Sequence, residues 1–354
     1  MKKLLAVLLC LAMIFTMFTA CGSGDGGDGS ETNAPTKDNP VTLKCATLFA
    51  EGHPVVDRMT VFAEKVAAET DGAINIKIFP SDSLGDSTAC FEEVMKGTID
   101  MTFNAGTSTY SELFMLPLLQ FLASTYDEAE ELYAPGNYMH NLLAGVAEEN
   151  NLKFLGFDFV GVGGMGFTKE PKNFAKWGED KGVLLRCAPM DISSRWAMDM
   201  GFRTTSINYS DLYTALQTGV CDGWSGGQPT VNYLSFGDVI KYYVQTDDFY
   251  ELNGIYVNQD LWNTFSAEQQ AVFENAAKEL YAQSFEDLKE DTEYYMDKME
   301  ESGIKVSRLT DEEKAYIADK TREVTWPYFY EVMGKEVFEG LFESYDFLNK
   351  YSVE

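Results

Sequence analysis

Cysteine and histidine are the residues most suited to nucleophilic or metal chemistry, and this sequence has few of them. Among 354 residues there are two histidines, His53 and His140, and six cysteines, at 10, 21, 45, 90, 187 and 221. No cysteine pair has the short spacing of metal ligands, and two histidines cannot build a histidine-rich metal site. The sequence contains no GxSxG motif, and nothing singles out a catalytic pair among its 56 acidic residues. We therefore expect no enzyme, no metal site and no cofactor.

One cysteine stands where a lipid is commonly attached. Lys2 and Lys3 precede an apolar run of roughly fifteen residues, too short for a comfortable membrane span but typical of a signal peptide. The run leads to small residues directly before Cys21. We expect a signal peptide at 1–20, a lipidated Cys21 and a location outside the cytoplasm, anchored to the cell membrane. The alternative is ordinary secretion with Cys21 as a free thiol.

The segment after Cys21 and the net charge both limit what the protein can bind. Residues 22–40 contain no large apolar side chain, so we expect 21–40 to be a lipidated cysteine with a flexible linker. The chain has 27 basic against 56 acidic residues, a net charge of −29. This balance argues against nucleic acid and anionic lipid as partners. It leaves an anionic ligand open, because one buried arginine can dominate a closed pocket.

The folded part begins with a pattern of strands and helices that predicts a parallel α/β unit. Strands are expected at 41–49, 73–79 and 99–103, and helices from Pro54 and at 88–96. Such sheets bind ligands beyond the carboxyl ends of their strands. Those ends are followed by residues 49–53, 80–86 and 104–107.

A second α/β block follows, with predicted strands at 152–158, 183–187, 220–224 and 239–246 and helices at 192–200 and 209–218. Gly161 to Gly164 lies between the blocks and indicates a crossing point. Cys187 and Cys221 fall in predicted strands and either form a disulfide or remain buried thiols. Ser266 and Gln269 form a capping box that starts a helix of about 36 residues, ~54 Å long. Such a rod serves as a spine across two lobes or as a dimerisation helix.

Five short motifs, in order, resemble one known family. They are EGHP (51–54), IFPSDSLGD (78–86), GTIDM (97–101), KGVLLR (181–186) and YSDLYTALQTGVCDGW (209–224). The chain resembles the solute-binding proteins of tripartite ATP-independent periplasmic (TRAP) transporters, the DctP family, over essentially all of 41–340. The most specific motif is TALQTGVCDG.

The resemblance implies an α/β, periplasmic-binding-protein-like clamshell of two lobes, with crossing strands and a long spine helix. We expect lobe I at 41–160 plus about 252–290, and lobe II at 161–251 plus about 291–354. The implied protein is a monomer that binds a small organic acid and delivers it to integral-membrane permease subunits. Two alternatives remain: a binding lipoprotein of an ATP-driven importer, and a sensory solute-binding protein.

The resemblance assigns the central binding role to Arg186. In the family, the arginine of the KGxxxR strand pairs with the carboxylate of the ligand. A planar guanidinium matches a carboxylate through two parallel hydrogen bonds. The alternative is a structural arginine paired with a neighbour such as Asp222.

The sequence also departs from the family pattern. A second arginine often follows the crossing between the lobes, where this chain has GVGGMG (161–166), with Gly163 or Gly164 at the equivalent position. The segment WSGGQPT (224–230) is altered as well. We therefore expect a monocarboxylate rather than a dicarboxylate, and room for a bulkier group beside the glycines.

Further ligand-binding candidates follow the predicted strand ends, and each has a structural alternative. They are Phe49, His53, Asn104, Met190, Trp224, Ser225 and Gln228. Asn104 and Gln228 can donate and accept hydrogen bonds, and Trp224 either stacks on a ligand or belongs to the core. His53 is more suited to starting a helix than to touching the solute.

Overall fold

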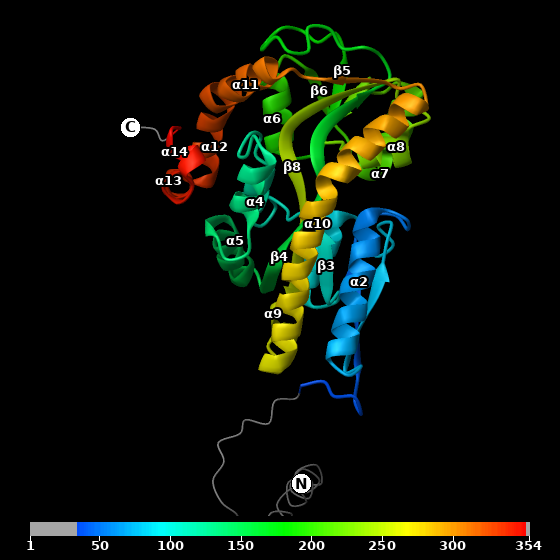
Figure 1. Ribbon diagram of the computed structural model, residues 1–354, viewed down its shortest axis with the longest axis vertical. Helices are drawn as coiled ribbons and strands as arrows, with labels where there is room; N and C mark the ends of the chain where they lie inside the picture. Colours follow the sequence, from blue (N-terminus) through cyan, green and yellow to red (C-terminus); the bar gives the residue numbers. More distant parts are fainter. Residues whose placement is uncertain (1–33, 352–354) are drawn as a thin grey trace, which may run out of the picture. The chain divides into compact units, whose positions relative to one another are not determined.

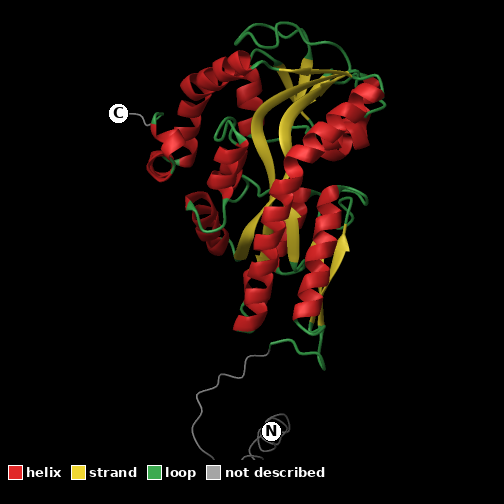
Figure 2. Cartoon of the chain, in the orientation of Figure 1, coloured by secondary structure: helices red, strands yellow, loops and turns green. Residues whose placement is uncertain are grey.

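The computed structural model describes residues 34–351, and one nine-stranded sheet runs through this part of the chain. Its strand order is β2-β1-β3-β8-β4-β7-β5-β6, and β9 pairs with β8. A parallel group of strands lies at each end, and two antiparallel strands connect them (Figures 1 and 2). No helix of the described residues is both long and apolar enough to cross a membrane. The predicted α/β class with crossing strands is confirmed.

The first parallel group follows the predicted order of strands and helices. Its elements are β1 (Val41–Ala46), α2 (Pro54–Glu69), β2 (Ile74–Phe79), α3 (Ser87–Lys96) and β3 (Met101–Asn104). Pro54 occupies the first turn of α2, where its missing N–H costs nothing. Gly97 ends α3 with a φ of 77°, a conformation that glycine adopts without strain.

The second parallel group has the same design. It contains β5 (Leu184–Cys187), α6 (Asp191–Asp199), β6 (Arg203–Ser206), α7 (Tyr209–Thr218), β7 (Gly223–Ser225) and α8 (Pro229–Phe236). The sequence did not predict β6, because its four residues, RTTS, include no apolar side chain. β6 is instead held by parallel pairing with β5.

Two long strands join the groups. They are β4 (Leu152–Phe167) and β8 (Tyr242–Asn258), which pair antiparallel along their whole length. The sequence predicted two short strands and a crossing point at these places. The structure joins strand and crossing point into β4, whose register to β8 shifts next to Gly161 and Gly164. Irregular pairing of this kind bends a strand locally.

The predicted spine is α10 (Ala267–Glu301), a helix of 35 residues that begins with the expected Ser266–Gln269 capping box. It packs against β4, α8 and α2, and therefore contacts both parallel groups (Figure 1). Arg58 of α2 is buried at the same junction. Its Nε atom lies 2.7 Å from the carboxylate of Asp158 on β4.

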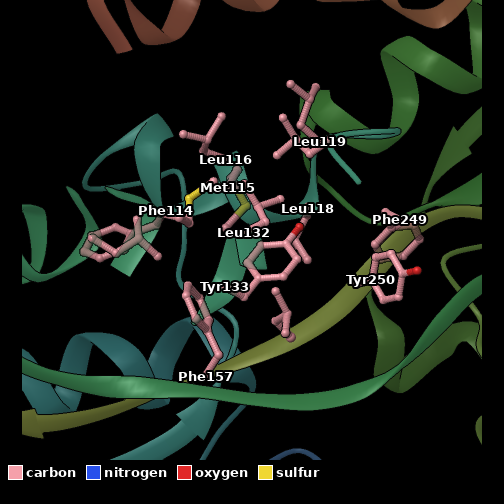
Figure 3. Packing of buried hydrophobic residues seen from close by; sticks show 14 of the residues in the cluster. Phe114, Met115, Leu116, Leu118, Leu119, Leu132, Tyr133, Phe157, Phe249 and Tyr250 are labelled. Atoms are coloured by element: carbon pink, nitrogen blue, oxygen red, sulfur yellow. The ribbon is translucent and has the colours of Figure 1, made fainter. Parts of the chain in front are cut away.

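Most of the remaining helices contribute to a large apolar cluster. The remaining helices are η1 (Glu112–Leu118), α4 (Tyr126–Tyr133), α5 (Tyr138–Glu149), α9 (Gln259–Trp262), α11 (Asp311–Lys320), η2 (Thr321–Thr325), α12 (Trp326–Met333), α13 (Lys335–Ser344) and α14 (Asp346–Asn349); β9 spans Lys305–Arg308. Of these, α9 and α11 pack in two other clusters. Figure 3 shows part of the large cluster, where Leu116, Leu132 and Tyr133 converge above Phe157 of β4.

The C-terminal helices contact both halves of the molecule. Trp326 belongs to the same apolar cluster as Phe91 of α3, and its Nε1 donates to the backbone carbonyl of Gln120 over 2.9 Å. On the other side, Nε1 of Trp196 in α6 donates to Thr321 over 2.9 Å. The sequence placed 291–354 with lobe II, whereas these contacts attach the C-terminal segment to both lobes.

The predicted signal peptide, Cys21 and most of the predicted linker lie outside the described residues. The last part of that linker, 34–40, lies within them. Thr36 and Asn39 form a short bridge, and the carbonyl of Pro35 accepts a hydrogen bond from Gln269 over 2.7 Å. This stretch is therefore hydrogen-bonded to the first turn of α10.

Candidate functional site

A cavity of about 450 Å³ lies at the carboxyl ends of the parallel strands in both groups. From the first group it is lined by residues that follow β1, β2 and β3, and from the second by residues that end or follow β5, β6 and β7. Phe249 and Glu251 of β8 complete the wall. This is the position at which α/β sheets bind ligands, and the volume suits a small organic molecule.

Arg186 lies in the wall of this cavity. It is near the end of β5, between Thr205 of β6 and Trp224 of β7, and its side chain is only 3% exposed. Nε donates to the carbonyl of Ile207 over 2.8 Å, which fixes the direction of the guanidinium. Among residues 34–351, no hydrogen bond is found for the two terminal nitrogens, and no carboxylate lies within 4.0 Å.

The structural alternative for Arg186 was a pair with a neighbour such as Asp222, and Asp222 is engaged elsewhere. Its carboxylate accepts from the backbone N–H of Leu184 over 2.7 Å and pairs with Lys169 over 2.9 Å. These contacts, together with nearby Arg203, outweigh burial and lower the pKa of Asp222. The aspartate thus holds the start of β5 in place. Burial lowers the pKa of Arg186, but an arginine remains protonated in proteins.

Three predicted residues line the cavity beside Arg186: Trp224 and Ser225, which end β7, and Gln228, which follows it. The indole of Trp224 donates to Asn232 over 3.0 Å, so its ring is held at a fixed angle. Gln228 is 1% exposed, and its amide nitrogen has no hydrogen-bond partner among the described residues. Met190, also predicted, lines the cavity ahead of α6.

On the opposite side, Phe49 lines the cavity, whereas His53 and Asn104 do not. His53 caps α2, accepting from the N–H of Val55 over 3.2 Å, and its ring stacks on Phe49 at 4.3 Å. Burial and then nearby Arg58 lower its pKa to about 3, so the imidazole is neutral.

Asn104 is also turned away from the cavity. Its side-chain oxygen accepts from the N–H of Leu48 over 3.1 Å, and its nitrogen donates to Thr102 over 2.8 Å. Both residues therefore shape the first wall indirectly, by fixing the loop that carries Leu48 and Phe49.

The sequence did not identify several residues of the wall, most of them polar. Glu251 and Phe249 were missed because β8 was expected to end at Thr246. Asp82, Asp86 and Gln120 also line the cavity. Asp82 and Asp86 stand in the IFPSDSLGD motif, so the position after a predicted strand was a usable signal for them; Gln120 lies in a stretch without a predicted element.

The glycines at the crossing point do not open space for a ligand. A side chain at Gly163 would collide with Phe249 at 2.6 Å, and one at Gly164 would collide with the hydroxyl of Tyr243 at 1.9 Å. Phe249 occupies the space beside Gly163 and itself faces the cavity. The predicted room for a bulkier group is therefore wrong, because aromatic side chains of β8 fill it.

The cysteines of the described part, at 45, 90, 187 and 221, are all unpaired and buried. Cys187 and Cys221 thus do not form the disulfide that the sequence left open. Residues 34–351 contain no group of three or more histidine, cysteine or acidic side chains able to hold a metal ion.

The fold and the cavity together define a class: two α/β lobes that enclose a solute between their strand ends. Residues 45–331 match the model of the family "Bacterial extracellular solute-binding protein, family 7", and the chain belongs to this family.

Known relatives of this chain are distant in sequence. The sialic acid-binding periplasmic protein SiaP of Vibrio cholerae is 22% identical over 244 residues, covering 68% of this chain and 74% of that protein. The 2,3-diketo-L-gulonate-binding periplasmic protein YiaO of Escherichia coli is 25% identical over 266 residues, covering 73% and 77%. The chain spans 65% of a relative from Haemophilus influenzae, at 24% identity.

Solved structures agree with the fold. A TRAP periplasmic solute-binding protein from Ochrobactrum anthropi superposes with a TM-score of 0.75 at 25% identity, covering 90% of this chain and 96% of that one. One from Desulfovibrio salexigens with bound orotic acid gives 0.79 at 19% identity, covering 88% and 99%. The predicted family and two-lobed fold are thereby confirmed.

Proposed function

We propose that this protein is the extracytoplasmic solute receptor of a TRAP-type transporter and that it binds a small organic acid, a monocarboxylate, through Arg186. The observation that carries the proposal is the guanidinium itself: it is buried in the wall of the cavity, aimed by Ile207, and its terminal nitrogens have no partner among the described residues. A guanidinium that is fixed in the wall of a cavity and has donors to spare is suited to pairing with an anion from outside the chain.

The comparisons support an acid as the solute. Two of the structural neighbours were solved with bound D-glucuronate and with orotic acid, and the Vibrio relative is named for sialic acid. Each of these compounds carries a single carboxylate. The cavity of this chain has one arginine and no lysine in its lining, which suits one carboxylate rather than two.

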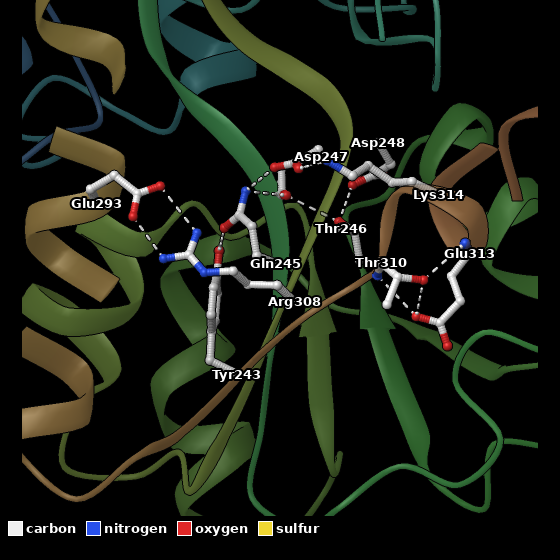
Figure 4. A network of polar contacts seen from close by, with 11 residues as sticks. Tyr243, Gln245, Thr246, Asp247, Asp248, Glu293, Arg308, Thr310, Glu313 and Lys314 are labelled. Carbon is white, nitrogen blue, oxygen red and sulfur yellow. Dashed lines mark hydrogen bonds and ion pairs between the residues drawn. The ribbon is translucent and has the colours of Figure 1, made fainter. Parts of the chain in front are cut away.

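Binding would require the two lobes to close over the solute. The lobes are connected by β4 and β8, and a polar network surrounds this connection (Figure 4). In it, Tyr243 donates to Gln245 over 2.8 Å, Gln245 donates to Asp247 over 2.7 Å, and Lys314 pairs with Asp247 over 2.6 Å. Hinge closure about such strands would bury Arg186 against the carboxylate.

The closed form would then dock on the membrane subunits of the permease, and the protein would act as a binding protein rather than an enzyme. Cys21 would carry the lipid that holds it at the cell membrane. Replacement of Cys21 by alanine should move the protein from the membrane fraction to the soluble fraction in immunoblots. Continued membrane retention would contradict the lipid anchor without affecting the role of Arg186.

The direct test is Arg186→Ala in the mature domain, with calorimetric titration of the acids found in a thermal-shift screen. Two charge-assisted hydrogen bonds would be lost, so affinity should fall at least about 100-fold. Arg203→Ala is the matched control, because Arg203 lies on neighbouring β6 but is exposed and does not line the cavity. Equal dissociation constants for Arg186→Ala and wild type would remove the proposed function.

A further inference from the structure

Polar atoms without partners gather at the cavity. Seven buried side-chain atoms of the described residues lack a hydrogen-bond partner, and four of them belong to residues that line it: Asp82, Gln120, Gln228 and Glu251. A buried polar atom left unpaired costs about 1–3 kcal/mol, so such atoms are rare unless another molecule completes them. The cavity is therefore built for a solute with several polar groups.

The charged side chains in the wall of the cavity do not match a solute whose only charged group is a carboxylate. Arg186 is the one cationic side chain in the lining, whereas Asp82, Asp86 and Glu251 supply three carboxyl groups. Asp86 is already used, because it caps α3 by accepting from the N–H of Ala89 over 2.9 Å. Asp82 and Glu251 each have a buried oxygen without a partner. A solute with only a carboxylate would complete Arg186 and leave both acids unpaired.

Glu251 is the stronger of these two candidates. It lies on β8 opposite Gly161, two residues after Phe249, and so forms part of the floor between the lobes. No ion pair joins it to Arg186, although both line the cavity. Burial raises the pKa of Glu251 to about 8, and Arg186 opposes this rise. The other titratable side chains that line the cavity, besides Arg186, are Asp82, Asp86 and Tyr209.

We propose that the solute is a zwitterion: its carboxylate pairs with Arg186 and its ammonium group is held by Glu251. This inference rests on the proposed role of Arg186 and narrows the class of organic acid. An ammonium group can donate three hydrogen bonds, and a carboxylate such as that of Glu251 only accepts them. The rings of Trp224 and Phe249 surround the same space and favour a cation near their faces.

The test uses matched sets in which one carbon skeleton carries an amino group, a hydroxyl group or only hydrogen. Butanoate substituted at carbon 2, 3 or 4 and 3-phenylpropanoate substituted at carbon 2 cover different separations of the two charges. Binding to the mature domain is measured by thermal shift and then by titration calorimetry. We expect an amino member to bind at least about tenfold more tightly than its hydroxyl and hydrogen counterparts.

Glu251→Gln keeps the size of the side chain and removes its charge, and should abolish this preference. The control, Glu130→Gln, changes an exposed glutamate that does not line the cavity and should retain it. Titrations in two buffers of different ionisation enthalpy add a second measurement. The amino member should release a proton on binding to wild type near pH 7, because its positive charge ionises Glu251, and should release none with Glu251→Gln.

The outcomes separate the two proposals. A screen without any amino member among the bound compounds, or one in which hydroxyl or hydrogen members bind as tightly, overturns the zwitterion. So does a preference that survives in Glu251→Gln. If Arg186→Ala binds the same compounds as well as wild type, the proposed function itself fails. If Arg186→Ala loses binding while Glu251→Gln keeps the preference, only the zwitterion is lost.

Discussion

Two buried arginines in this molecule differ in how completely they are paired. At the junction of α2 and β4, Arg58 donates to Asp158 over 2.7 Å and to the carbonyl of Phe159 over 2.6 Å. In the cavity, Arg186 has a single hydrogen bond, to the carbonyl of Ile207. Arg58 is 9% exposed and Arg186 is 3% exposed, so burial does not distinguish them. The comparison shows that burial alone does not identify a ligand-binding arginine. The distinguishing property is that the terminal nitrogens of its guanidinium have no partner among the residues that the structure describes.

The largest effect should come from breaking the paired arginine. Asp158→Ala leaves Arg58 buried without its carboxylate, which typically costs about 3–5 kcal/mol. Urea denaturation should show this loss in the free energy of unfolding. Asp57→Ala, an exposed acid next to Arg58 on α2, is the control and should change stability by no more than about 0.5 kcal/mol. A small effect of Asp158→Ala would mean that the two arginines are equivalent after all.

The acid opposite Arg186 should give the ligand-free protein an unusual pH dependence. The pKa of Glu251 is about 8 in the folded state and near 4.5 in the unfolded chain, so the folded state binds more protons between these values. Stability should therefore fall as pH rises from about 5 to 8, by about 3–4 kcal/mol from this group.

Denaturation of wild type and Glu251→Gln across this pH range isolates the contribution of Glu251. Asp248, whose pKa burial raises to about 7, acts in the same direction in both proteins and cancels in the comparison. Parallel stability curves for the two proteins would show that Glu251 is already ionised and paired.

The smallest effect should have the opposite sign. Arg186→Met keeps a long side chain and removes an incompletely paired charge, so the ligand-free domain should gain about 1 kcal/mol. A thermal melt without ligand should show a higher midpoint than wild type, while binding of the acid is lost. A lower midpoint would mean that Arg186 stabilises the fold in the way that Arg58 does.

Much of the fold was predictable because local signals agree with it. Three such signals mark helix ends: His53 caps the start of α2, Gly97 ends α3, and the capping box at Ser266 starts α10. The resemblance of KGVLLR placed Arg186 on a strand, and the structure puts that strand end at the cavity.

The floor of the cavity was not predictable in the same way. Glu251 stands in a stretch of β8 with charged residues and no clean alternation, so only its pairing with β4 reveals a strand there. Asn104 was expected just after the third strand and is instead the last residue of β3, and its side chain accepts a hydrogen bond from Leu48 instead of facing the cavity. Which way a strand-end side chain turns depends on the loop that lies over it, and that is a tertiary contact.

The contact between Gln120 and Trp326 links the cavity to the C-terminal helices. The side chain of Gln120 faces the cavity, while its backbone carbonyl holds the indole of Trp326 at the start of α12. A solute that binds Gln120 and shifts its backbone would also shift Trp326 and the start of α12. The same C-terminal segment is bonded to α6 through Thr321, so α6 should move with it. We therefore expect the position of the C-terminal helices to differ between the ligand-free protein and the protein with a solute in the cavity.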